Sequence, residues 1–403
     1  MLEPESSMGS IGKYLAIEGN IRVLAVQTLI SQLGLGMFFV VWQPLILARG
    51  VSVVELGVIQ SVMNLSTAAG LIAWGAISDR YGRKPVILVS HSCRILAMGA
   101  LIASGEYAFL VAFAFLMGFS SQFMVGNPAR SALISESVGK GNMATAYSTL
   151  MSVSQITNTV MASAGGYIAV SMGYTPILYA SILGDVFGLA LLTVYIKETL
   201  DTGRVEKGGS EGLLQRLRGF LMPEPGIGRL YLIMLLLGLG YGTGYSLFYG
   251  TLVDNYGYTD LQLGLLSTAF NLTWGLSSIP LGKISDRFGK KTMLMASLGM
   301  SLITVLGFLT FRSFGAFLFF QITSALDPAI WIPAWMTLLS ERVPRERLSL
   351  VMGKIDSYAK LSGIPAPWLG GLLYSANGFK APLYVHLAFL LLSGVVVFTL
   401  KES

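Results

Sequence analysis

The stretch GAISDRYGRKP, Gly75–Pro85, places glycines, one carboxylate and three cations side by side in an otherwise apolar chain. It returns 207 positions later as GKISDRFGKKT, Gly282–Thr292, with seven of its eleven residues identical. A duplication separated by half of the chain predicts that the protein consists of two related halves. Each half carries one polar loop of the same composition.

The composition around these loops is that of a membrane protein. The chain has 403 residues, of which 53% are hydrophobic and only 12% are charged, whereas a soluble domain has about 25% charged residues. Apolar runs recur that are long enough to cross about 30 Å of hydrocarbon as helices, and too long for barrel strands of about 9–11 residues. The sequence therefore predicts an all-α membrane protein with several spans.

Twelve apolar segments can be placed along the chain. The first six lie near residues 22–47, 53–77, 85–104, 107–136, 143–171 and 175–196, and the second six near 229–254, 260–284, 291–311, 314–341, 347–376 and 380–400. With both termini in the cytoplasm, most loop cations fall on the cytoplasmic side, and the opposite loops carry only Arg49, Arg312 and Lys380. This asymmetry is typical of the positive-inside rule. We interpret the net charge of +6 as a topology signal and not as a nucleic-acid footprint.

Several classes of site are not expected from this sequence. The single cysteine, Cys93, lies inside a predicted span, and the histidines His91 and His386 are far apart. Neither a disulfide framework nor a metal site is predicted from them. The start of the chain has no signal-peptide pattern. We expect no cofactor.

The duplication extends beyond the two loops and predicts the domains. Arg22 matches Arg229 at the same spacing of 207, and Gly165-Gly166 matches Gly370-Gly371 at a spacing of 205. We expect an N-terminal six-helix bundle over 1–196, a cytoplasmic linker with a short interfacial helix over 197–228, and a C-terminal six-helix bundle over 229–403. Parallel repeats of this kind are typical of transporters that bind their substrate near the membrane midplane.

The loop pattern G-x-x-S-D-R-x-G-R/K-K resembles the signature loop of the major facilitator superfamily. The resemblance covers essentially the whole chain and implies twelve transmembrane helices in two pseudo-symmetric six-helix bundles. Compared with the drug:proton antiporter branch, whose pattern is nevertheless the closest, the fourth span lacks an R-x-x-x-G motif. The fifth span keeps only Gly165 and Gly166 of a longer glycine-proline signature.

The loop residues predict one cytoplasmic gate network in each half. The glycines should allow close helix packing or a tight reversal, whereas the carboxylates and cations should pair. We interpret these contacts as formed when the cytoplasmic side is closed and broken when it opens; the alternative is a static loop with topogenic charge. The network residues are Gly75, Asp79, Arg83 and Glu136 in the first half, and Gly282, Asp286, Lys290 and Glu341 in the second.

Charged residues inside spans are costly and need a reason. In the third and sixth spans, Arg94 and Asp185 lie about 15 and 18 Å from the cytoplasmic ends, so we predict a structural ion pair. In the tenth and eleventh spans, Asp327, Asp356 and Lys360 are candidates for proton coupling, with Lys360 competing for the proton-binding carboxylate. The alternative is a structural triad that does not titrate.

Uncharged polar and aromatic residues supply candidates for a substrate cavity, because rings bury apolar area and amides fix orientation. For any single one of them, ordinary helix packing is the favoured interpretation over ligand contact. The candidates are Gln27, Gln32, Gln60, Asn64, Gln122 and Gln155 in the first half, and Tyr241, Tyr245, Asn271, Trp274, Trp331 and Trp335 in the second. The glycine run GLGYGTG, Gly238–Gly244, lies inside a span and is interpreted as a site of bending or close packing.

These features predict a secondary-active transporter in the plasma membrane that moves a small amphiphilic organic solute by alternating access. We expect proton-coupled export, a monomer, and protons, the solute and membrane lipid as partners. The alternative is symport or facilitated uptake of a small organic solute or anion. A sensor or enzyme that lost transport is a remote alternative, because no ATP-binding loop or catalytic motif is present in the sequence.

Overall fold

The computed structural model describes residues 17–103, 105–121, 127–138, 143–200, 222–343 and 345–400, without the side chains of 144, 279, 285–287 and 345–350. Every regular element in these ranges is a helix, and they contain no strand. The interfacial helix expected within the linker, the N-terminal segment and Gln122 lie outside the described residues.

The helices of the first half follow the predicted spans. They are α2 (Gly19–Leu47), α3 (Val53–Tyr81), α4 (Arg83–Ile102), α5 (Tyr107–Phe119), α6 (Pro128–Ser137), α7 (Met143–Met172) and α8 (Thr175–Tyr195). The fourth predicted span is the one that differs, because it is divided between α5 and α6. The side chain of Asn127 caps α6 by accepting from the N–H of Ala129 at 3.0 Å, and Pro128 follows at the first helical position.

The second half has the same order with two further breaks. Its helices are α10 (Gly228–Gly244), α11 (Phe248–Tyr256), α12 (Asp260–Phe288), α13 (Lys290–Thr310), α14 (Phe314–Arg342), α15 (Arg345–Ser362), α16 (Ala366–Asn377) and α17 (Lys380–Phe398). The seventh and eleventh predicted spans are divided, as α10/α11 and α15/α16. Among the described residues, eight helical segments are long and apolar enough to cross a membrane, with Gly228–Tyr256 taken as one. Together with the divided and more polar helices, these segments cover all twelve predicted spans within the described ranges.

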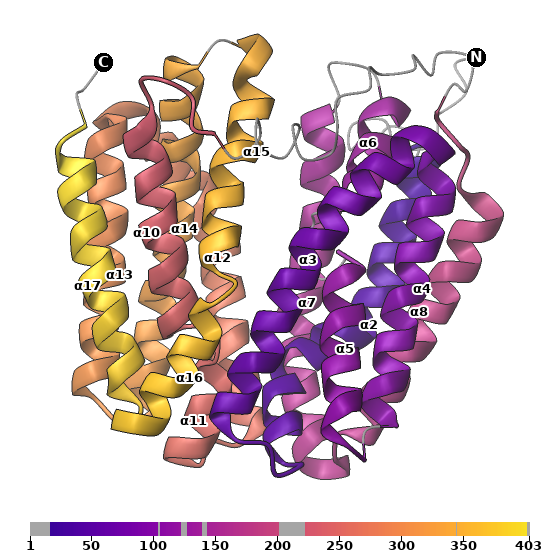
Figure 1. The fold of residues 1–403 in the computed structure, drawn as a ribbon, viewed down its shortest axis with the longest axis horizontal. Coiled ribbons are helices and arrows are strands. Elements are labelled where there is room, and N and C mark those ends of the chain that lie inside the picture. Colours follow the sequence, from indigo (N-terminus) through magenta and orange to yellow (C-terminus); the bar gives the residue numbers. More distant parts are fainter. Residues whose placement is uncertain are drawn as a thin grey trace, which may run out of the picture. The chain divides into compact units, whose positions relative to one another are not determined.

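The chain forms two compact units, comprising residues 1–39 with 62–208 and residues 40–61 with 209–403. In the first unit, α4 packs against α5, α6 and α8 (Figure 1). Its core joins buried residues of α2, α4 and α6, including Leu24, Ile87 and Leu133. In the second unit, α13 and α12 pack against α14, and α10 packs against α15 and α17. Its core includes Tyr231 and Leu339.

The hairpin of residues 40–61, the end of α2 and the start of α3, packs on helices of the second unit. Gln43 donates its side-chain N–H to the carbonyl of Ser246 at 2.7 Å and accepts from the N–H of Gly250 at 2.8 Å. The amide of Gln43 thus bonds backbone groups at the break between α10 and α11. A Cβ at Gly57 would lie 2.7 Å from the carbonyl oxygen of Pro367, so this helix pair needs a glycine to pack.

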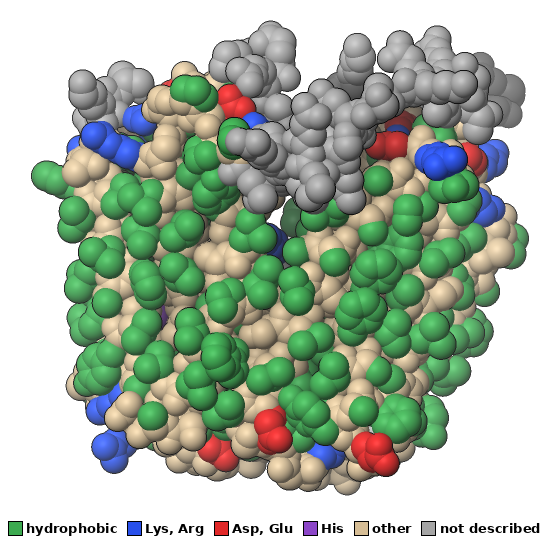
Figure 2. Space-filling model, in the orientation of Figure 1, with side chains coloured by type: hydrophobic (Ala, Val, Ile, Leu, Met, Phe, Trp, Pro, Cys, Tyr) green, Lys and Arg blue, Asp and Glu red, His purple; other side chains and the backbone are tan. Residues whose placement is uncertain are grey.

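The surface of each unit matches the expected solvent. On the face drawn in Figure 2, hydrophobic side chains cover the middle of both units, whereas Lys, Arg, Asp and Glu gather toward the ends of the helices. Large apolar side chains such as Leu96, Phe187 and Val395 are more than half exposed. Exposure on this scale is expected where lipid replaces water.

Candidate functional site

The loop between α3 and α4 is held by one arginine that contacts two carboxylates. Gly82 has a φ of 105°, a conformation that favours glycine, and it places Arg83 at the start of α4. The Arg83 guanidinium donates to Asp79 at 2.6 Å and to Glu136 of α6 at 3.0 Å. Arg83 is buried, with 9% of its surface exposed. The structure therefore brings together the three charged residues predicted for the first gate network.

The second copy of the loop has the same turn and a simpler contact. Gly289 has a φ of 77°, and Lys290 lies 2.6 Å from Glu341 of α14. Both side chains are about one-third exposed, at 32% and 33%. The side chain of Asp286 lies outside the described residues. Two of the three charged members of this network thus meet.

Gly75 and Gly282 make no close helix contact with the described residues of their own units, so their proposed packing role stays a prediction. A Cβ at Gly75 would meet Pro128 at 3.8 Å, an ordinary contact, and one at Gly282 would meet nothing within 4 Å. The glycines that do pack closely lie elsewhere, for example in the run at the end of α10. A Cβ at Gly242 would lie 2.6 Å from that of Ala366.

The residues just after α8 extend the first network. Glu198 accepts the backbone N–H groups of Arg83 and Lys84 at 2.9 Å each, and those of Thr199 and Leu200 at the same distance. Burial raises the pKa of the Glu198 carboxyl, but these four N–H donors outweigh burial and hold the pKa below its usual value. Thr199 also donates its hydroxyl to Glu136 at 2.5 Å. The start of the linker is therefore bonded to the loop.

Arg94 of α4 and Asp185 of α8 form a buried ion pair in the first unit. The guanidinium donates to the two carboxylate oxygens at 2.7 and 2.5 Å. The exposed fractions of the two side chains are 4% and 0%. His91 contacts the backbone carbonyl of Asp185 at 3.0 Å. The bidentate geometry gives the carboxylate a full countercharge.

Asp327 of α14 has a different environment, made of hydroxyl groups. Ser301 of α13 donates to the carboxylate at 2.5 Å, and Ser297 of α13 and Tyr241 of α10 donate to it as well. The ring of Tyr241 contacts that of His386, with centroids 4.7 Å apart. The described residues place no Lys or Arg in ion-pair contact with Asp327. A carboxylate held in this way can accept a proton without displacing a cation.

The charged residues of α15 do not join Asp327. Asp356 and Lys360 are both exposed, and no ion pair forms between Lys360 and Asp327. Lys360 was expected to compete for Asp327 or for Asp356, and of these two carboxylates Asp356 lies within its electrostatic reach. Lys354, also on α15, is buried and pairs with Glu224 at 2.7 Å.

The cavity candidates are distributed over both units. Most are partly buried, as Gln32, Gln60, Asn64, Gln155, Tyr245, Asn271, Trp274 and Trp331 are, whereas Gln27 and Trp335 are buried. Trp331 and Trp335 stack with centroids 5.3 Å apart. Gln32 bonds Ser154 of α7 at 2.6 Å, and Asn271 bonds Ser267 one turn away at 3.3 Å. Gln27 bonds Arg130, and Tyr241 bonds Asp327.

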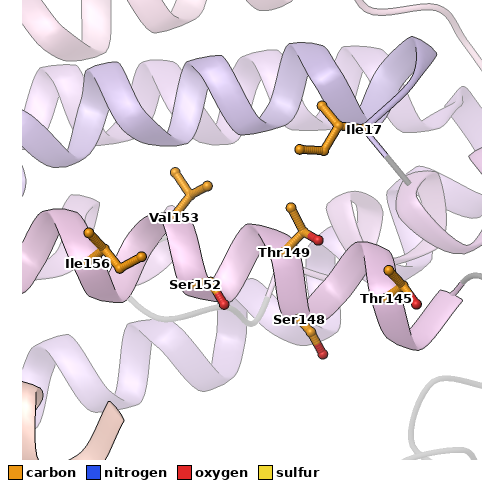
Figure 3. Close-up of a pocket in the computed structure, with 7 residues that line it drawn as sticks. All are labelled: Ile17, Thr145, Ser148, Thr149, Ser152, Val153 and Ile156. Carbon is orange, nitrogen blue, oxygen red and sulfur yellow. The ribbon is translucent and has the colours of Figure 1, made fainter. Parts of the chain in front are cut away.

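Residues of α7 line a cavity of about 540 Å³ in the first unit (Figure 3). Ile17 closes one side of it, just before α2. The other lining residues are Thr145, Ser148, Thr149, Ser152, Val153 and Ile156, all from α7. Within the described residues, no group of three or more His, Cys, Asp or Glu could hold a metal ion.

Sequence reasoning missed three side chains that the structure places in polar contacts: Gln43, Arg130 and Glu198. Arg130 donates to Gln27 at 3.0 Å and to Thr28 at 2.6 Å. Arg130 could have been found from the sequence, because it is a charged residue inside the fourth predicted span, about 9 Å from Glu136 by helical rise. Glu198 and Gln43 carry no comparable signal, since a polar residue at the end of a span is ordinary.

Comparisons with known proteins agree with this architecture. The sequence profile described as "Major Facilitator Superfamily" matches residues 24–249 and 230–403. The chain is similar to the multi-drug resistance efflux pump PmrA of Streptococcus pneumoniae, with 25% identity over 81% of each chain. It is also similar to the multidrug resistance protein MdtG of Escherichia fergusonii, with 26% identity over 86% of this chain and 83% of the other.

Among solved structures, a bacterial homologue of the iron transporter ferroportin, in its inward-facing state, matches with a TM-score of 0.75. The match covers 94% of this chain and 97% of the other, at 17% identity. At that identity, the likeness supports the fold.

Proposed function

This chain belongs to the major facilitator superfamily of membrane transporters, and we propose that it exports amphiphilic organic solutes in exchange for protons, by alternating access. Relatives named as multidrug efflux proteins support the cargo class and the direction. Location in the plasma membrane with both termini in the cytoplasm is part of the same proposal, and rests on the distribution of loop cations. We keep the monomer as a prediction.

The proposal of proton coupling rests on one observation: hydroxyl groups, and no cation, donate hydrogen bonds to the Asp327 carboxylate among the described residues. An ionised carboxylate within a spanning helix is costly when no cation balances it. Protonation removes that cost, and Ser297, Ser301 and Tyr241 can then exchange roles as donors and acceptors. Asp327 is therefore our proposed proton carrier, and Asp356 is the second candidate on the neighbouring α15.

The duplicated loops are our proposed gate elements. Each network lies within one unit, joining the loop after α3 to α6, and the start of α13 to α14. We propose that these ion pairs hold each cytoplasmic loop in one conformation. Each loop would then move as a rigid element when the transporter changes state. The linker segment at Glu198 and Thr199 would move with the first loop, because both residues bond it.

The proposal can be tested with purified protein in proteoliposomes. Rhodamine 123 and fluorescein, an aromatic cation and an aromatic anion, are supplied under an imposed pH gradient and again after the gradient is dissipated with a protonophore. We expect gradient-dependent movement of at least one dye, opposite in direction to the proton flux. Movement with the protons would indicate symport, and no gradient dependence for either dye would contradict proton coupling.

The variant Asp327→Asn identifies the carrier. The amide keeps the shape of the side chain but cannot bind and release a proton at working pH. We expect gradient-driven transport to fall to background, while dye exchange without a gradient continues. Asp356→Asn is the matched control and should retain gradient-driven transport. Full coupling in Asp327→Asn, with loss in Asp356→Asn, would move the role to Asp356.

A further inference from the structure

Arg130 of α6 differs from Arg83 and Arg94, two buried cations of the first unit, in its hydrogen-bond partners. Its guanidinium donates to Oε1 of Gln27 at 3.0 Å and to Oγ1 of Thr28 at 2.6 Å, both on α2. These acceptors are neutral and well buried, with exposed fractions of 1% and 8%. Gln27 is oriented by a second bond, from its Nε2 to Ser31 at 2.9 Å. The guanidinium is therefore held in a built position and not free on the surface.

No described residue supplies the countercharge. Asp185 is bonded on both oxygens by Arg94, and Glu136 pairs with Arg83. Neither carboxylate reaches Arg130, and the nearby charge of Arg94 opposes it. Among Arg83, Arg94 and Arg130, Arg130 is therefore the one that has no carboxylate partner within the described residues. An unbalanced charge in a spanning segment is costly, and arginine cannot remove it by losing a proton.

The guanidinium also keeps most of its hydrogen-bonding capacity. It has five N–H donors, and two of them bond Gln27 and Thr28, which leaves three without an acceptor among the described residues. A planar fork of donors matches a carboxylate, sulfonate or phosphate oxygen pair. Arg130 is only partly buried, so the fork can be reached.

The surroundings select the rest of the ligand. The core shared by α2 and α6 also has partly buried hydrophobic residues that a ligand can reach, among them Val23 and Tyr147. Tyr147 is close enough to Arg130 to interact with it electrostatically. An inorganic anion would lose its hydration here without gaining apolar contact, whereas an organic anion gains both. We propose that Arg130 binds the anionic head group of the transported solute, and that the cargo therefore includes amphiphilic organic anions. This inference rests on the proposed transport function and names its substrate class.

The test compares three probes that share one ring system. Binding of 2-naphthoate, its neutral amide 2-naphthamide and the cation 2-naphthylmethylammonium is measured on purified wild-type protein in detergent, by titration and by thermal shift. We expect the carboxylate to bind about tenfold more tightly than the amide, because its bonds to Arg130 are charge-assisted. Equal affinity of the carboxylate and the amide for wild type would overturn the proposal.

Two variants assign the preference to Arg130. Arg130→Gln should abolish the preference for the carboxylate, and Arg130→Lys should keep part of it, since lysine retains the charge but not the fork. Arg22→Gln is the matched control, because Arg22 is an exposed cation near the start of α2; it should bind like wild type. A preference that persists in Arg130→Gln would contradict the assignment.

Stability without ligand separates binding from a structural role. If the cation is there for a ligand, Arg130→Gln should unfold at the same temperature as wild type or higher, because a costly charge has been removed. A large loss of thermal stability in Arg130→Gln, restored by Arg130→Lys, would indicate a structural cation and overturn the proposal.

A parallel measurement with sodium sulfate tests whether the site binds an inorganic anion instead of an organic one. Sodium sulfate at the same concentration should stabilise wild type less than 2-naphthoate does; equal stabilisation would reject the amphiphile. Binding requires no gradient, so its result is independent of transport. Carboxylate binding through Arg130 without transport of any probe would leave the site standing and reject the proposed function. Gradient-driven transport without tighter binding of the carboxylate than of the amide would reject Arg130 as an anion site and leave the proposed function standing.

Discussion

Asp185 and Asp327 are both carboxylates inside spanning helices, but their partners differ in kind. Asp185 accepts two bonds from the Arg94 guanidinium, whereas Asp327 accepts three from hydroxyl groups. The first carboxylate is neutralised by a permanent cation and the second is not. The difference teaches that burial alone does not identify a proton-binding group, because the partner's charge decides whether protonation is needed.

The internal repeat relates the partners of the two carboxylates. Ser301 stands 207 positions after Arg94, the spacing that relates the two signature loops, and Ser297 stands 207 after Ser90. At equivalent places in the two halves, a guanidinium on α4 corresponds to a hydroxyl on α13. The two carboxylates are not themselves equivalent, since Gln122 stands 205 positions before Asp327 and Leu390 stands 205 positions after Asp185. The two halves therefore share a backbone plan but place both the carboxylate and its partner differently.

The largest effect is expected when the second half is given the cation of the first. Ser301→Arg should place a guanidinium against Asp327, remove the need for a proton and reduce gradient-driven transport to background. Transport in proteoliposomes with and without a pH gradient checks this. Ser301→Ala, which removes one donor and adds no charge, is the control and should retain coupling. Coupled transport in a folded Ser301→Arg protein would contradict the comparison.

The second prediction concerns the ion pair of the first half. Asp185→Asn leaves the Arg94 guanidinium buried without a countercharge, which costs about 3–5 kcal/mol, and the yield of folded protein should fall accordingly. The double variant Arg94→Gln with Asp185→Asn removes both charges and should recover most of the loss. Folded yield and unfolding temperature in detergent measure both. Additive losses would show that the two residues act independently.

The third prediction compares the two loops. Arg83 is buried and bonds two carboxylates, whereas Lys290 is one-third exposed and bonds one. Arg83→Ala should therefore destabilise the protein by about 1–3 kcal/mol, and Lys290→Ala by less than about 1 kcal/mol. Thermal unfolding of the two variants side by side gives the order. An equal loss would mean that the second loop has partners outside the described residues.

The smallest effect is expected from Glu198. Its pKa is lower in the folded protein than in the unfolded chain, so its contribution to stability is complete above about pH 4.5 and is lost as the pH falls through the folded pKa. Because the side chain is exposed, we expect less than about 1 kcal/mol. The unfolding temperature of wild type should therefore decline toward that of Glu198→Gln between pH 5 and pH 3, measured in steps. If the unfolding temperatures of wild type and Glu198→Gln changed with pH in parallel, Glu198 would make no pH-dependent contribution to stability.

Much of the fold follows from the sequence, because span length and the loop repeat depend only on local composition and spacing. Three helix breaks were not predicted, since apolar content continues across them. At the site, Arg94 and Asp185 could be paired because few charges lie at that depth. The partners of Asp327 could not, because serine and tyrosine are common in spans and only packing selects which ones face a carboxylate.

The side-chain amide of Gln43 has a consequence for the α10–α11 break. It bonds the carbonyl of Ser246 and the N–H of Gly250, two backbone groups that no helix satisfies at that point. Moving the 40–61 hairpin away from α11 would leave both groups without partners in an apolar region. Water must then enter to bond these two groups. Movement of the hairpin away from α11 and hydration of the α10–α11 break therefore occur together.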